Sequence, residues 1–103
     1  MKSHATIESE IMNALHKVAR RLLWWKTPEA ALTDTHRLLA QVMTYGALSD
    51  VQVALERYGR TAFLETLLHA PPGVFDARSW RYWHLMFARP VPPLPVRIVT
   101  AGH

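Results

Sequence analysis

The sequence has no cysteine and no long apolar run, and each absence excludes a class of protein. Without cysteine, the chain of 103 residues forms no disulfide bond, thiolate nucleophile or cysteine-ligated zinc site. Its apolar stretches fall well short of the roughly 20 residues that a transmembrane helix needs. The first ten residues lack the apolar segment of a secretion signal. We therefore expect a cytoplasmic protein without a membrane partner.

Motifs for catalysis and for cofactor or metal binding are also missing. The sequence contains no P-loop, no G-x-S-x-G, no G-x-G-x-x-G and no carboxylate pair spaced for general acid and base catalysis. None of the six histidines stands four residues from another, as the two histidines of an H-E-x-x-H zinc helix do. We predict that the protein is not an enzyme and holds no cofactor or metal.

The residues that are present suit one small folded domain with an excess of positive charge. Half of them are hydrophobic and ten per cent are aromatic, which is enough for one core. Twelve Lys and Arg residues outnumber eight Asp and Glu residues, so the formal net charge is +4. This charge favours acidic partners but is too small to prove nucleic-acid binding.

Capping residues and helix breakers divide the chain into five predicted helices. Apolar residues recur every three or four positions in the first, and each of the others begins with Thr, Ser or Asp. Gly46, Gly59 and a Pro71–Pro72 pair end three of them. The predicted helices cover residues 7–25, 33–45, 49–58, 61–70 and 76–87, with a connector over 25–32. Because the loops are short, we expect an all-α fold, a compact bundle of about five short helices.

A proline-rich segment begins at Arg89. Four prolines within residues 90–95 prevent a helix and favour an extended polyproline conformation. We therefore divide the chain into a helical domain, residues 1–88, and an extended C-terminal tail, residues 89–103. Arg89, Pro92 and Pro95 have the spacing of one class of Src-homology-3 ligand, but this pattern is common by chance. We expect the tail to dock on its own domain or on a specific partner.

Residues 49–70 form a helix, a turn containing Gly59 and a second helix, so a helix-turn-helix has to be considered. Four apolar residues within 63–68 use half the surface of the second helix. After Arg60 this helix offers no Arg, Lys, Asn or Gln that would read base edges. An αα-hairpin within the bundle is the simpler interpretation. A helix-turn-helix-like DNA-binding transcriptional regulator stays as the alternative function.

Basic and aromatic residues alternate in two segments of the chain. Arginine beside aromatic side chains is typical of protein interface hot spots and also of surfaces that stack nucleic-acid bases. The four tryptophans are many for one small core, so they either fill it or lie at a binding surface. The residues concerned are Arg20, Arg21, Trp24 and Trp25 in the first segment and Arg78, Trp80, Arg81 and Trp83 in the second.

Five short motifs resemble a family of small bacterial helical proteins of unknown biochemistry. They are Leu23-Trp24-Trp25, Leu32-Thr33-Asp34-Thr35-His36, Tyr45-Gly46-Ala47-Leu48-Ser49-Asp50, Arg57-Tyr58-Gly59-Arg60 and Ser79-Trp80-Arg81-Tyr82-Trp83. Most of these residues mark helix ends. Lys26 stands where members usually have Asp after the early aromatic pair. Members of this family are often encoded next to AbiEii-type nucleotidyltransferase toxins and are regarded as antitoxins.

The resemblance implies an antitoxin of a toxin–antitoxin system, which binds and neutralises a nucleotidyltransferase toxin through a protein–protein interface. Basic and aromatic side chains would then block the toxin's nucleotide or tRNA entrance. The family supplies no catalytic residues. From composition we expect the partner-binding residues to be Arg20, Arg21, Trp24, Trp25, Arg78, Arg81, Arg89, Pro92 and Pro95.

Overall fold

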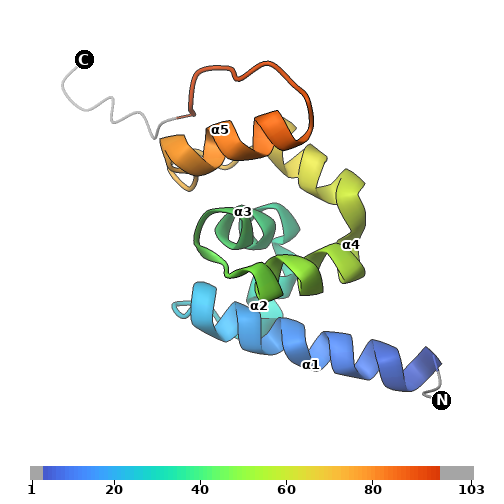
Figure 1. Ribbon diagram of the computed structural model, residues 1–103. Helices are drawn as coiled ribbons and strands as arrows, with labels where there is room; N and C mark the ends of the chain where they lie inside the picture. Colours follow the sequence, from blue (N-terminus) through green and yellow to red (C-terminus); the bar gives the residue numbers. More distant parts are fainter. Residues whose placement is uncertain (1–3, 96–103) are drawn as a thin grey trace.

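Five helices and no strand make up residues 4–95, the part of the chain that the computed structural model describes. The prediction of an all-α fold is therefore confirmed. Figure 1 shows α1 along one side of the molecule, α5 on the opposite side, and α3 between them. The helices are α1 (His4–Leu22), α2 (Pro28–Thr33), α3 (Thr35–Tyr45), α4 (Leu48–Leu68) and α5 (Ala77–Met86).

The connector predicted over residues 25–32 contains a short helix, α2. The Ala30 N–H donates a hydrogen bond of 3.2 Å to Thr27 Oγ1, which caps this helix. Pro28 stands in its first turn, where backbone N–H groups form no hydrogen bond within the helix, so the absence of this group in proline costs nothing. Pro28 therefore begins α2, although the sequence pattern predicts only part of a connector at this position.

The helix α4 is bent at Gly59, where two separate helices were predicted to meet. Gly59 has φ 84° and ψ 166°, which lies outside the helical region and strains any residue with a Cβ. The predicted break is confirmed, although the second half follows the first with no loop between them. Figure 1 shows the first half beside α1 and α3 and the second half turning towards α5.

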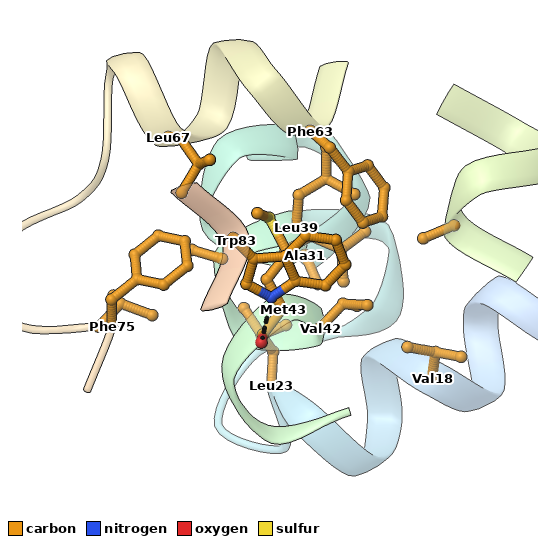
Figure 2. Packing of buried hydrophobic residues seen from close by; sticks show 14 of the residues in the cluster. Val18, Leu23, Ala31, Leu39, Val42, Met43, Phe63, Leu67, Phe75 and Trp83 are labelled. Atoms are coloured by element: carbon orange, nitrogen blue, oxygen red, sulfur yellow. Dashed lines mark hydrogen bonds between the residues drawn. The ribbon is translucent and has the colours of Figure 1, made fainter. Parts of the chain in front are cut away.

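The core lies between the five helices. Its side chains come from all five and from the loop before α5, and they interdigitate around Trp83 (Figure 2). The Trp83 Nε1–H donates a buried hydrogen bond of 2.8 Å to the Met43 carbonyl oxygen, which ties α5 to α3. Fully buried members of the core include Leu15, Leu23, Leu38, Leu39, Val42 and Phe63.

Residues 89–95 of the proline-rich tail run back across α5 as an extended strap (Figure 1). The Trp80 Nε1–H donates a hydrogen bond of 2.8 Å to the Pro92 carbonyl oxygen. The Gly73 N–H donates to the Pro95 carbonyl oxygen at 3.4 Å, and Leu94 packs against the core. Of the two expected positions, this part of the tail docks on its own domain. Residues 96–103 lie outside the described part of the chain.

Among residues 4–95, no helix has both the length and the apolar character needed to cross a bilayer.

Candidate binding surface

Trp24 and Trp25 lie exposed at the turn that follows α1. Their exposed fractions are 76% and 50%, although the preceding Leu23 is fully buried and anchors the turn in the core. The Lys26 N–H donates to the Leu23 carbonyl oxygen at 3.0 Å and closes the turn. The two indole rings meet edge to face, with centroids 5.7 Å apart and an interplanar angle of 88°. The local backbone thus presents both rings on a fixed support.

Tyr45, the last residue of α3, lines an open hollow together with the two indoles. Its exposed fraction is 62%. The hollow measures about 370 Å³ and lies between the end of α1 and the end of α3. We call this surface the aromatic corner; its residues are Arg21, Leu22, Trp24, Trp25, Gln41 and Tyr45.

An ion pair holds Arg21 at the aromatic corner. Its guanidinium contacts the carboxylate of Asp50, whose side chain is 6% exposed, while the Arg21 side chain remains 57% exposed. The same Asp50 carboxylate accepts a hydrogen bond of 2.8 Å from the Ala47 N–H at the start of α4. Asp50 therefore connects α1 with α4, orients Arg21 and neutralises part of its charge. Beside it, the Lys26 Nζ lies 3.8 Å from an oxygen of Asp34.

The second basic and aromatic segment has a different geometry. Trp80 and Trp83 on α5 are only 4% and 9% exposed, whereas Arg78 and Arg81 are exposed on the outer face of the same helix. The helical period separates them, because positions three apart share a face and adjacent positions do not. Arginine and tryptophan are therefore not combined into one accessible surface on α5.

The nine residues expected at a partner surface fall into two regions. Arg21, Trp24 and Trp25 line the same hollow, and Arg20 is exposed one position before Arg21 on α1. The remaining residues lie on α5 and on the strap, on the opposite side of the molecule (Figure 1). They are exposed Arg78, Arg81, Arg89 and Pro92, and half-buried Pro95.

Sequence reasoning missed three residues of the aromatic corner, Leu22, Gln41 and Tyr45. Tyr45 follows the apolar spacing of α3, which is the pattern of a core residue, and only its place at the helix end leaves it exposed. Its position directly before the helix-ending Gly46 was the available signal. Gln41 is 9% exposed, and no sequence signal distinguishes a buried glutamine from one on the surface.

No group of three or more His, Asp or Glu side chains within residues 4–95 is arranged to hold a metal ion. Two groups in this range have a shifted pKa, and both lie away from the aromatic corner. Burial raises the pKa of the Tyr58 hydroxyl, and a hydrogen bond from the Ser79 backbone lowers the pKa of Asp76. The aromatic corner thus combines exposed aromatic rings with the polar side chains of Arg21 and Gln41.

No protein-family model, no curated protein and no solved structure matches this chain. The resemblance to the antitoxin family rests on the sequence motifs alone.

Proposed function

We propose that the protein is an antitoxin-like binding protein that docks a nucleotidyltransferase-type toxin on its aromatic corner and neutralises it. The observation that carries the proposal is the pair of adjacent tryptophans, 76% and 50% exposed. Large aromatic side chains gain free energy when they leave water, at about 25 cal/mol for each Å² of apolar surface. In the free protein both rings remain in contact with water, so a partner that covers them would gain this free energy on binding.

The support beneath the tryptophans suits a stable interface. Buried Leu23 anchors the turn, and Asp50 holds Arg21 in place. A side chain that is already ordered loses little conformational entropy on binding. Trp, Tyr and Arg are also enriched at the centres of interfaces, where they carry most of the binding energy. The net charge of +4 favours an acidic surface on the partner.

The nature of the partner comes from the family resemblance. A nucleotidyltransferase has an acidic, metal-binding active site, which a basic and aromatic surface complements in charge. Within this proposal, exposed arginines of α5 and the strap, together with two prolines of the strap, form a second contact area for the same partner. These residues are Arg78, Arg81, Arg89, Pro92 and Pro95.

The second half of α4 does not favour the alternative, a helix-turn-helix-like DNA-binding regulator. Phe63, Thr66 and Leu67 are buried against the core. The outer face includes Glu65, whose charge would oppose the phosphates of DNA, and Leu68, which is 52% exposed. The second half of α4 therefore lacks the surface of a recognition helix, and the experiment below includes DNA binding as its second arm.

The test is co-expression of the full chain with the product of the neighbouring gene, which the proposal expects to be a nucleotidyltransferase-type toxin. The wild type should co-purify with the toxin and suppress its activity. Replacing both Trp24 and Trp25 by Ala should weaken binding by roughly a thousandfold, since two hot-spot side chains of about 2 kcal/mol each contribute about 4 kcal/mol together. Ile7→Ala is the control, because Ile7 is a large hydrophobic residue of α1 that is 43% exposed and lies outside both proposed contact areas.

Two results would contradict the proposal: separate elution of the two wild-type proteins at micromolar concentration, or full binding by the double variant. A promoter fragment provides the second arm of the experiment. Retardation of this fragment that falls steeply with salt, and that survives in the double variant, would support the DNA-binding alternative instead.

A further inference from the structure

Part of the wall of the aromatic corner is polar. Gln41, a residue that is 9% exposed, lines the hollow, and its side-chain amide makes no hydrogen bond with any group within residues 4–95. The amide is not sealed from solvent, because in this range Thr44 Oγ1 is the one fully buried side-chain polar atom without a partner. A glutamine amide offers two N–H donors and two acceptor positions. The amide is therefore available to a ligand that supplies both a donor and an acceptor.

The walls of the hollow are flat aromatic rings. Trp24, Trp25 and Tyr45 all line it, and each is at least half exposed. A volume of about 370 Å³ lies in the range of sites for small organic molecules. Because every nucleobase has a π-face, aromatic walls of this kind stack bases. The walls therefore favour a planar ligand that the amide contacts along its edge.

A positively charged rim completes the hollow. Arg21 lines it with a side chain that is 57% exposed, so that its pairing with Asp50 leaves part of the guanidinium accessible. Lys17 and Arg20 are exposed on the preceding turn of α1. Guanidinium groups bind phosphate through paired N–H donors. The rim therefore favours a ligand in which a phosphate is attached to the planar ring system.

We propose that the aromatic corner binds a nucleotide. The base stacks on one of the two indoles, which are perpendicular to each other. The edge of the base pairs with the Gln41 amide, and the phosphate of the nucleotide contacts Arg21. Adenine fits this arrangement, because its N6 donor and N7 acceptor match a glutamine amide. A free mononucleotide and the end of a single strand present the same chemistry. The site does not depend on the proposed toxin, although a protein partner docked on the aromatic corner would compete with the nucleotide.

The indole N–H signals of the full chain provide the readout in a nitrogen–proton correlation spectrum. Adding AMP should move the signals of Trp24 and Trp25, assigned by single Trp→Phe variants. Those of Trp80 and Trp83 should stay in place, because their N–H groups are bonded to the Pro92 and Met43 carbonyl oxygens. Ribose 5-phosphate, which lacks the base, should cause no comparable shift.

The decisive variant is Gln41→Leu. It should weaken AMP binding by about tenfold, because the base edge loses its partner. Its melting temperature should stay close to that of the wild type, because the Gln41 side chain makes no hydrogen bond within residues 4–95. Gln52→Leu is the matched control, since Gln52 is exposed on α4 and lies outside the hollow. This control should bind AMP like the wild type.

A short oligoadenylate distinguishes the two sources of the ligand. Tighter binding of the oligonucleotide than of AMP supports a strand end, and equal binding supports a mononucleotide. Three results would each overturn the proposal: no shift of the Trp24 and Trp25 signals with millimolar AMP, equal binding of ribose 5-phosphate, or unchanged AMP affinity in the Gln41→Leu variant. Failure of the toxin to co-purify would leave these outcomes unaffected.

Discussion

Trp24 and Trp25 are adjacent in the sequence, whereas Trp80 and Trp83 stand three residues apart on α5. Positions three apart share one face of a helix, so the α5 pair enters the core together. Both buried indoles donate hydrogen bonds, to the Pro92 and Met43 carbonyl oxygens at 2.8 Å. Trp24 and Trp25 follow the last turn of α1, and both project from the protein surface.

The difference between the two pairs shows that tryptophan content alone does not indicate a binding surface. Both pairs have arginine neighbours in the sequence. On α5, however, the indoles face inwards and the arginines outwards, so that the tryptophans contribute to stability. At the aromatic corner the indoles and Arg21 line the same hollow, so they are available to a partner. Substitutions should therefore affect stability in one pair and binding in the other.

The largest effect on stability is expected for Trp83→Ala. Trp83 contacts Phe63 and Phe87, with ring centroids 5.5 and 6.5 Å away, and its N–H pairs with the Met43 carbonyl. The variant should lower the free energy of unfolding by about 3–5 kcal/mol in urea denaturation. Should it not fold, Trp83→Phe keeps a ring but removes the donor and should cost about 1–3 kcal/mol. Wild-type stability in both variants would refute the assignment of Trp83 to the core.

Trp80→Phe should have a smaller effect, located at the strap. It removes the donor to Pro92 and reduces packing against Phe75, so we expect a loss of about 1–2 kcal/mol. The Gly73 amide, which donates to the Pro95 carbonyl oxygen, should exchange its hydrogen faster. Unchanged exchange at Gly73 would show that the Trp80 hydrogen bond does not hold the strap in place.

Asp76 caps the helix that carries the buried pair, and its contribution should depend on pH. The hydrogen bond of 2.7 Å from the Ser79 N–H lowers the pKa of Asp76 below its ordinary value of 3.8. The ionised cap therefore stabilises the fold above this value, and the gain is lost as the pH falls through the lowered pKa. Asp76→Ala should cost about 1 kcal/mol at pH 7.

The pH dependence provides the check on this cap. The difference in unfolding free energy between wild type and Asp76→Ala should shrink as the pH falls below 3.8. Asp76→Asn is the control, because asparagine caps a helix without a titrating group. A difference that stays constant down to pH 2 would mean that the charge of Asp76 does not contribute.

The smallest change in stability is expected for the exposed pair. The combined Trp24→Ala and Trp25→Ala variant should unfold within about 1 kcal/mol of the wild type, because only a largely exposed ring contact is lost. The same variant should lose binding at the aromatic corner. If the free energy of unfolding fell by more than 3 kcal/mol in thermal or urea denaturation, Trp24 and Trp25 would contribute to stability as Trp80 and Trp83 do, which would contradict this comparison.

Much of the fold was predictable, because helix ends depend on the local backbone. Gly59 marks the bend of α4, Asp76 caps α5, and Gly46 follows the end of α3. The one missing helix, α2, shows the limit of this reasoning. Thr27 and Pro28 together form a helix start, but a proline after a long helix was interpreted only as a stop.

The candidate site was predictable only in part. Arg21, Trp24 and Trp25 were selected from composition, and they do line one hollow. Gln41 and Tyr45 complete it from α3, twenty residues further along the chain. A contact between distant segments depends on how the helices pack, so it cannot be predicted from local residue patterns. The partner-binding roles of the nine selected residues stay predictions.

The sequence by itself determined where most helices begin and end, since capping and chain reversal depend on interactions within a few residues. Only the tertiary structure decided which tryptophans are core and which are surface. The burial of Trp83 depends on α3, α4 and α5 meeting, and the exposure of Trp24 on the absence of any element in residues 4–95 that covers it. The hydrophobic effect acts on whatever surface the packing leaves, and this surface is set by the whole chain.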